Sequence, residues 1–457
     1  MSLVSDPSQP AATNGGPARK RSFHLSFLRL PHNVYLLLLF TTGKGFQLTI
    51  ATLTLNYYVH SLGYSPAFIG LFSAMPAIGA LASAIPVGRL ADHIGRKPVL
   101  LVTAVLTPLF LALCGLVTSA PLLLILSFTQ GLVSTAYWVT NLPLLVESTT
   151  ENQRIGVLAL NSFLLLGIGA LGNLLGGAIP EFVAGILHVS AASMLPLRWG
   201  VLTAASFTFI FGLPLWFLRE PARTRKHTSP VLADERPESI VVNATGASVE
   251  PAVPVVAIPT NSKASSREQR PAWLFIQLLL PDLVFTMGEG AVVALIQLYF
   301  ILRFHLLPGP LGVIFTISGL AGGLFSLTAP LFVRRWSKLR LVTSVQYLTA
   351  PLMILIGFSP TLPLAISGEY ARSFMRTLIE PVYAAFAMEQ VSDSQRATLA
   401  GFYSVTWSIG FSIGPTIAGW LQSNINLSAS FIFGAFCLTL APTLLLIFFG
   451  KKKARAL

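Results

Sequence analysis

The sequence predicts an all-α membrane protein of twelve transmembrane helices, arranged as two six-helix bundles related by a pseudo-twofold axis. Apolar residues make up 53% of the 457 positions and charged residues only 10%, which leaves too little polar surface for a fold surrounded by water. Apolar stretches of about 20 residues, long enough to cross a bilayer core as a helix, recur from Val34 to Phe449. These stretches are continuous, whereas a transmembrane barrel alternates apolar and polar residues.

Twelve spans can be counted along the chain. The first six cover residues 34–58, 67–88, 98–118, 120–146, 155–182 and 196–218, and the second six cover 272–301, 309–333, 340–358, 361–388, 397–422 and 427–449. A polar interval rich in Pro, Ser, Thr and charged residues separates the two sets, as expected of a flexible linker. We therefore expect a disordered cytoplasmic tail at 1–32, a first bundle at 33–218, a mostly disordered cytoplasmic linker at 219–270, a second bundle at 271–450 and a basic tail at 451–457.

An internal repeat supports the division into halves. Ile69-Gly70 and Leu311-Gly312 each open the second span of a half, 242 residues apart. Two parallel copies of a six-helix unit place a substrate site between them, near the middle of the bilayer. The same offset aligns Glu147 with Glu389, Arg154 with Arg396, Gly172 with Gly414 and Gly177 with Gly419.

The net charge of +13 is concentrated on one side of the predicted membrane. Of the 30 Lys and Arg residues, 25 fall in the tails and in the loops on the side of the termini. The positive-inside rule then places both termini in the cytoplasm, in a plasma (inner) membrane.

No basic stretch is interleaved with aromatics in a soluble domain, so nucleic-acid binding is not expected. Cys114 and Cys437 lie inside apolar spans, so neither a disulfide framework nor a metal site is predicted.

The second span ends in GRLADHIGRK, residues 88–97, which resembles the loop signature of the major facilitator superfamily. In that family the loop latches one conformational state; the alternative is a basic loop that only sets topology. The counterpart at 331–341 is also basic but lacks the Asp and the Gly, so its latch is expected to be degenerate. The residues assigned to the latch are Gly88, Asp92, Gly95, Arg96, Lys97, Glu147 and Arg154.

Small residues in the fifth and eleventh spans form a second partial resemblance. The family's antiporters carry G-P-x-x-G-G in the fifth span, and this chain has the same spacing with Asn173 in place of the proline. This resemblance implies an antiporter. The alternative is that the glycines only allow close helix packing. The residues concerned are Gly172, Gly176, Gly177, Gly414, Pro415 and Gly419.

Charged residues inside the membrane are costly and therefore indicate function. Lys44 in the first span and Glu289 in the seventh occupy equivalent places, so we expect them to form a pair across the pseudo-twofold; alternatively Lys44 contacts Gln47, and Glu289 contacts arginines of the tenth span. In the tenth span, spacings of three and four put four charged residues on one face: Glu369, Arg372, Arg376 and Glu380. They form either a solute or proton site or a ladder of ion pairs that satisfy one another and only fix the packing. Weaker candidates are Gln130, Tyr137, Asn141 and Trp407.

The resemblance and the buried charges together predict a secondary transporter that works by alternating access. No P-loop, zinc-protease motif or nucleophile with a base is found, so enzyme activity and cofactors are not expected. The expected partners are a small-molecule solute, protons or another coupling ion, and the lipid bilayer, with the protein a monomer. Proton-coupled efflux of an amphipathic or drug-like compound is the first hypothesis. Uptake of an organic anion held by Lys44 and the two arginines of the tenth span is the second, and a non-transporting membrane sensor or assembly factor the third.

The topology can be tested with reporter fusions. A reporter that is active only in the cytoplasm should work when fused after Leu457, because the basic residues favour that side. Alkaline phosphatase, which is active only outside the cytoplasm, should be inactive at the same position. High phosphatase activity there would contradict the expected topology.

Overall fold

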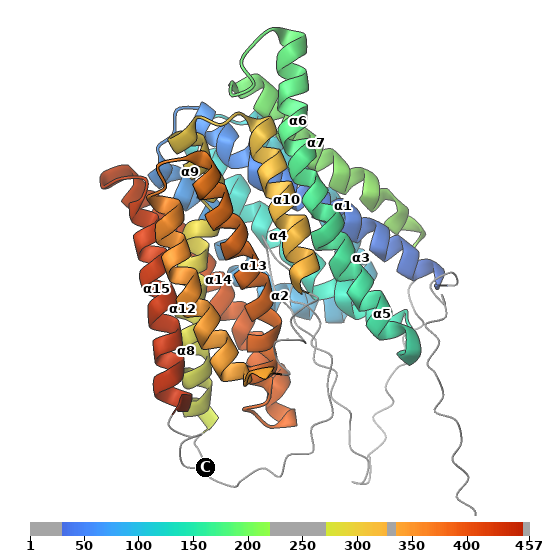
Figure 1. Cartoon of the computed structure of the whole chain (residues 1–457). Coiled ribbons are helices and arrows are strands. Elements are labelled where there is room, and N and C mark those ends of the chain that lie inside the picture. The colour runs from blue at the N-terminus through green and yellow to red at the C-terminus, as the bar shows by residue number, and fades with distance from the viewer. Residues whose placement is uncertain (1–29, 220–270, 327–334, 451–457) are drawn as a thin grey trace, which may run out of the picture. The chain divides into compact units, whose positions relative to one another are not determined.

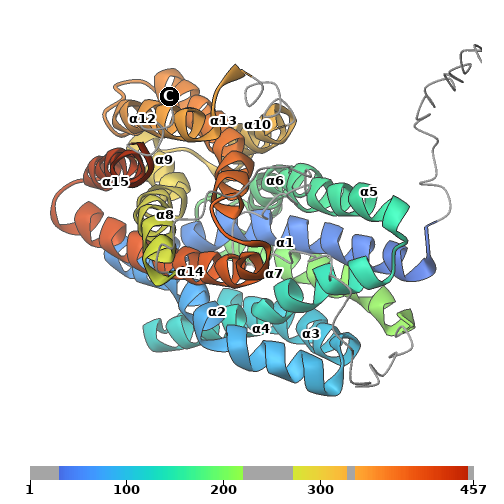
Figure 2. The same cartoon turned by 90° about the horizontal axis from the view of Figure 1, so that it is seen from below.

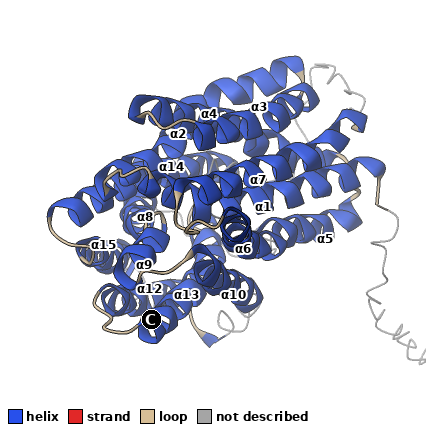
Figure 3. Ribbon diagram, turned by 90° about the horizontal axis from the view of Figure 1, so that it is seen from above, coloured by secondary structure: helices blue, strands red, loops and turns tan. Residues whose placement is uncertain are grey.

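The computed structural model describes residues 30–219, 271–326 and 335–450, and every regular element in these ranges is a helix (Figure 3). Residues 1–29 of the expected N-terminal tail, residues 220–270 of the expected linker, residues 327–334 of the second basic loop and the expected tail at 451–457 lie outside the described residues. The described chain from Pro31 onward belongs to one compact unit.

Each predicted span overlaps one or more of the observed helices (Figure 1). In the first half these are α1 (His32–Ser61), α2 (Pro66–Ile94), α3 (Arg96–Leu116), α4 (Ala120–Glu147), α5 (Glu151–Ser162) with the π-helical turn η2 (Phe163–Ile168) and α6 (Gly169–Leu187), and α7 (Met194–Gly212) with the turn η3 (Leu213–Phe217). In the second half they are α8 (Pro271–Val293), α9 (Ile296–Phe304), α10 (Pro308–Ser326), α12 (Lys338–Gly357), α13 (Leu362–Met388), α14 (Asp393–Asn424), and α15 (Ala429–Leu445) with the turn η4 (Leu446–Gly450).

Nine helical stretches of the described chain are long and apolar enough to cross a membrane. The other three predicted spans are helices α10, α13 and α14, and each departs from a uniform apolar helix for a visible reason. The described part of α10 is short, α13 carries four charged residues, and α14 is rich in Ser, Thr and Gly. Polar helices of this kind are tolerated in a membrane where they face other helices or a cavity rather than lipid.

One predicted helix is broken in the structure. The sequence predicts a single span over 272–301, but α8 ends at Val293 and α9 begins at Ile296. The side-chain amide of Asn56 on α1 donates a 2.9 Å hydrogen bond to the carbonyl of Ala294 in the gap. A freed carbonyl in the membrane needs such a partner, so a residue of the first half stabilises the break in the second. The expected span is nevertheless present as one apolar stretch, Ala272–Phe304; hydropathy carries no information about the break or its long-range partner.

The two halves join through a pair of equivalent helix contacts. A side chain at Gly70 of α2 would clash with the backbone carbonyl of Pro415 on α14, and one at Gly312 of α10 would clash with the carbonyl of Asn173 on α6. Each pair lies 242 residues from its counterpart, so α2–α14 and α10–α6 are the same contact made twice. Reciprocal contacts of this kind are what a twofold relation between two units requires. Gly419 and Gly177 complete the two contacts.

The apolar cores are shared at one end of the helices and separate at the other. The largest core, near the α1–α2 and α9–α10 loops, joins first-half residues such as Tyr57 and Ile69 to second-half residues such as Tyr299. Toward the opposite ends of the helices, the described residues include two smaller cores, each within one half. One contains Ala91, Val99 and Ala136, and the other contains residues of α8, α12, α13, α14 and α15. In Figure 2, viewed from that end, α8, α12, α13 and α15 form a group beside α14.

The tight contacts predict unequal effects of two substitutions in α6. Gly177→Ala should lower the free energy of unfolding by about 1 to 3 kcal/mol, because its methyl group would meet the backbone of Pro308 and Gly309. The matched control Gly185→Ala has nothing within 4 Å of the added methyl and should be neutral or stabilising, by up to about 1 kcal/mol. Thermal unfolding of the two purified variants in detergent measures the difference. Equal stability would contradict the close packing of α6 on α10.

Candidate functional site

Two adjoining cavities lie among the helices. The first, of about 110 Å³, is lined mainly by α1, α2, α3 and α4 of the first half. The second, of about 180 Å³, is lined by both halves, with residues from α1, η2 and α6 on one side and from α8, α9, α10 and α13 on the other. Leu48, Thr52 and Val293 border both cavities, so a solute in one is close to the wall of the other.

Lys44 lines the first cavity and is only 2% exposed. Its ammonium group donates to the amide oxygen of Gln47 at 2.8 Å and to the hydroxyl of Ser134 at 2.9 Å. The ring of Tyr137 lies below the ammonium, with 5.8 Å between the nitrogen and the ring centroid. Lys44 forms no ion pair with a described carboxylate. A buried cation with only neutral partners is energetically costly.

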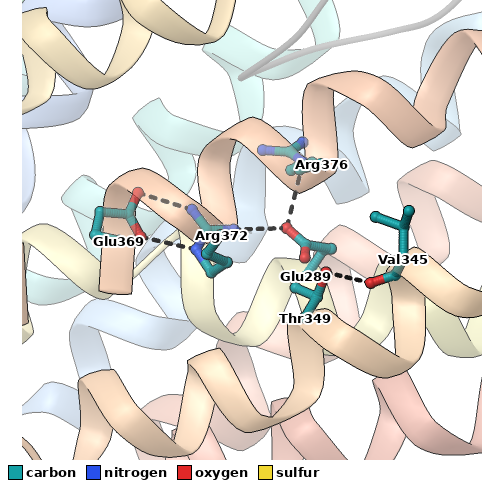
Figure 4. A network of polar contacts seen from close by, with 6 residues as sticks. All are labelled: Glu289, Val345, Thr349, Glu369, Arg372 and Arg376. Atoms are coloured by element: carbon teal, nitrogen blue, oxygen red, sulfur yellow. Dashed lines mark hydrogen bonds and ion pairs between the residues drawn. The ribbon is translucent and has the colours of Figure 1, made fainter. Parts of the chain in front are cut away.

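A network of four charged side chains lies beside the second cavity (Figure 4). Glu369 accepts two hydrogen bonds from Arg372, at 2.7 and 2.9 Å, and Arg372 also donates to Glu289 Oε2 at 3.0 Å. The Nε of Arg376 is 3.3 Å from the same oxygen. Two carboxylates and two guanidinium groups balance in formal charge. All four residues are buried, and paired hydrogen bonds of this kind are what makes buried charges tolerable.

The observed partners differ from the expected pair. Lys44 and Glu289 do not form an ion pair in this structure, and each has a partner that the alternative prediction named: Gln47 for Lys44 and the two arginines of α13 for Glu289. The expected ladder along α13 is found between Glu369 and Arg372, which are three residues apart. It is not self-contained, because Glu289 of α8 bridges the two arginines. Glu380 lines the same cavity.

The remaining predicted polar residues divide into cavity residues and packed residues. Gln130 lines the first cavity with Gln47. Tyr137 and Asn141 instead belong to a buried hydrogen-bonded cluster with Thr41 and Asn161. Trp407 is not among the described lining residues of either cavity; it stacks on Phe411, which borders the first, with 4.4 Å between the ring centroids.

Two further residues of α4 belong to the first cavity. Ser134 binds Lys44 directly, and Trp138 lines the cavity wall. The indole N–H of Trp138 is buried and has no hydrogen-bond partner among the described residues. Both stand on the α4 face that includes Gln130, at spacings of four residues. Helical periodicity from Gln130 is a signal that could have identified them.

The predicted latch forms an ion pair, and so does its counterpart in the second half. Arg96 at the start of α3 pairs with Glu147 at the end of α4. Lys338 pairs with Glu389, and these two residues stand 242 positions after the first pair. The second half thus keeps an equivalent ion pair although its loop lacks the Asp and the Gly; that its latch is degenerate stays a prediction. The repeat offset could have revealed this ion pair.

Other latch residues take different places in the loop. Gly95 has a φ of 105°, a conformation that favours glycine, and this allows the sharp turn between α2 and α3. Gly88 has open space where a side chain would be. Asp92 is exposed and Lys97 is half-buried. Arg154 is half-buried near the start of α5, and its Nε has no hydrogen-bond partner in the described part of the chain.

The glycines of α6 and α14 pack closely on the first helix of each half. Gly172 and Gly176 lie against α1, and Gly414 lies against α8. The residue between them in the motif differs in its role between the two copies. Asn173 lines the second cavity, and its side-chain amide oxygen has no hydrogen-bond partner among the described residues.

The charge network predicts strong coupling between its members. Arg372→Met should lower the free energy of unfolding by about 3 to 5 kcal/mol, because it leaves two buried carboxylates without their main partner. Adding Glu369→Gln should restore part of the loss, since it removes one of the stranded charges. A double-mutant cycle from thermal unfolding measures this coupling. As a control, Arg96→Met breaks a half-exposed pair and should cost about 0 to 1 kcal/mol. Simple additivity of the two changes at Arg372 and Glu369 would rule out the network.

Comparison with known proteins identifies the family. The sequence model of the Major Facilitator Superfamily matches residues 35–375 and 283–456. The major facilitator-type transporter psiT2 of Psilocybe cyanescens is 35% identical over 133 residues, which is 27% of this chain and 25% of that protein. Its counterpart in Psilocybe cubensis is 32% identical over 133 residues. The aligned segment is thus about a quarter of the length of these relatives.

Solved structures of transporters share the fold at low sequence identity. A bacterial homologue of the human lysosomal transporter Spinster, inward-facing and occupied, has a TM-score of 0.65 at 14% identity, over 91% of this chain and 94% of its own. A mutant of the nucleoside transporter NupG gives 0.66 at 14%, over 91% and 100%. The human organic anion transporter MFSD10 (TETRAN) gives 0.57 at 17%, over 90% and 98%. With a family model that covers nearly all the predicted spans, the chain belongs to the Major Facilitator Superfamily.

Proposed function

We propose that this protein is a proton-coupled secondary transporter that exports an amphipathic small solute by alternating access. Membership of a family of small-solute transporters supports the general activity. The observation that carries the proposal is the pair of adjoining cavities, which combine apolar walls with buried ionisable groups. Such a lining suits a solute with one polar or charged end and an apolar body. The proposal extends to a monomer in the plasma (inner) membrane, with the termini and the linker in the cytoplasm.

The arrangement of the apolar cores supports alternating access. The halves share a core near the α1–α2 and α9–α10 loops and have separate cores at the opposite ends. The ion pairs Arg96–Glu147 and Lys338–Glu389 lie at those opposite ends, and each stays within one half. With the expected topology this is a state closed to the outside. Rocking about the glycine contacts of α2–α14 and α10–α6 would exchange the closed and open ends.

Glu289 is the carboxylate that we propose to carry the proton. It is 1% exposed, and both Arg372 and Arg376 contact its Oε2. Its Oε1 has no hydrogen-bond partner among the described residues. Protonation of Glu289 would change the formal charge of the four-residue network from zero to +1 and weaken the attraction to Arg372 and Arg376. The network borders the second cavity, so this change reaches a solute that lies there.

Uptake of an organic anion is the second candidate function. The specific observation in its favour is the buried ammonium group of Lys44, which has only neutral partners. Arg372 and Arg376 favour it less, because both already contact carboxylates. Direction of transport separates the two candidates, and a non-transporting sensor would give no flux in either direction.

Proton coupling can be tested in proteoliposomes that contain the pH dye pyranine. Ethidium, 2-naphthoate and 2-naphthamide serve as cationic, anionic and neutral amphipathic probes. We expect at least one of them to drive proton movement with the wild type, and none with Glu289→Gln, because the amide cannot exchange a proton. Counterflow exchange of the same probe should survive in Glu289→Gln, and Glu289→Asp should retain part of the proton movement.

Two outcomes would contradict the proposal. Proton movement that persists in Glu289→Gln would assign the coupling to another group. Absence of both proton movement and counterflow from well-folded wild type, relative to empty vesicles, would refute transport of amphipathic solutes of these three charge types.

A further inference from the structure

We propose that Lys44 binds the anionic head group of the solute in the first cavity, and that the solute is a monoanionic amphipath such as an aromatic carboxylate. The charge network around Glu289 then does not hold the head group. The assignment to a transported solute rests on the proposed function, whereas binding itself can be measured without transport.

The charge balance of the two cavities distinguishes them. In the second cavity, Arg372 and Arg376 already contact Glu289, and Arg372 contacts Glu369 as well. In the first cavity, no carboxylate is among the described lining residues. Lys44 therefore contributes one positive charge that no described acidic side chain balances, in surroundings that screen charge poorly. An anion bound there would supply the missing counter-charge, whereas an anion at the network would compete with two carboxylates already in place.

Hydrogen-bond donors around Lys44 also suit an anion. An ammonium group has three N–H donors, and two of them are used by Gln47 and Ser134. The third remains for a ligand. The buried indole N–H of Trp138, on the same cavity wall, has no hydrogen-bond partner among the described residues. Such a donor costs free energy unless a ligand or water satisfies it. Gln130 adds an amide to this polar side of the cavity.

The rest of the cavity defines the body of the solute. Most of the lining is apolar, including the side chains of Leu48, Leu55, Phe72, Leu111 and Phe411. Such walls favour an aromatic or short aliphatic group over a sugar or a peptide. One ammonium group matches one negative charge, which favours a carboxylate over a doubly charged phosphate monoester. A longer body would extend past Leu48 and Thr52, which also border the second cavity.

Matched probes test the charge requirement. The full-length protein is placed in lipid nanodiscs, and binding of 2-naphthoate and its neutral analogue 2-naphthamide is measured by calorimetry, with empty nanodiscs subtracted. We expect wild type to bind naphthoate roughly tenfold or more tightly than naphthamide, the scale of one charged hydrogen bond. Lys44→Met should abolish that preference, and Lys44→Arg should keep part of it. Trp138→Phe should weaken naphthoate binding several-fold. Arg303→Met, which removes an exposed cation outside both cavities, should change nothing.

Opposite results would overturn the proposal. These are a wild type that binds naphthamide as tightly as naphthoate, or a folded Lys44→Met that keeps the preference. Loss of the preference in Arg376→Gln but not in Lys44→Met would move the head group to the network. Size-exclusion profiles and melting curves identify variants that fail to fold. If Lys44→Met does not fold, the preference of the wild type for naphthoate and the effect of Trp138→Phe test the proposal. Naphthoate binding at Lys44 without any flux would refute the transport function alone, whereas flux indifferent to probe charge would refute this proposal alone.

Discussion

The close approach of helix backbones at two glycine contacts is the constraint on which the rest of this structure depends. At Gly70 and at Gly312 the facing helix comes so near that no side chain fits between them. In a bilayer, helices gain little from hiding apolar surface, because lipid is equally apolar, and close packing supplies the attraction instead. These contacts hold α2 against α14 and α6 against α10. The walls of both cavities are placed by the same helices.

Burial inside the membrane also explains why the charged side chains occur in groups. Glu289, Glu369, Arg372 and Arg376 satisfy one another across α8 and α13, which reduces the cost of keeping four charges away from water. Lys44 is the contrasting case, since its described partners are neutral oxygens. The second cavity therefore borders two arginines that already contact carboxylates, and the first borders a single positive charge. That difference is the physical basis for giving the two cavities different roles.

The sequence predicted the helices well, because twenty-residue apolar stretches have few alternatives in a membrane. It also predicted the family, through GRLADHIGRK, and the repeat, through a constant offset. It did not predict which of two partners a buried charge contacts. Lys44 was expected to face Glu289, but Gln47, one turn away, and Ser134 of α4 bind it. Nor did it predict the break after Val293, which depends on Asn56 some 238 residues away. Partner choice depends on side-chain placement between helices, which periodicity does not determine.

The position shared by Asn173 and Pro415 shows how duplicated sequence can diverge in purpose. The backbone carbonyl of each residue lies against a glycine of the opposite half, so the same contact is made in both halves. This backbone contact does not depend on the side chain. Pro415 is not among the described lining residues of either cavity, whereas Asn173 lines the second. The side chain at this position can therefore differ between the two halves while the backbone contact is kept in both.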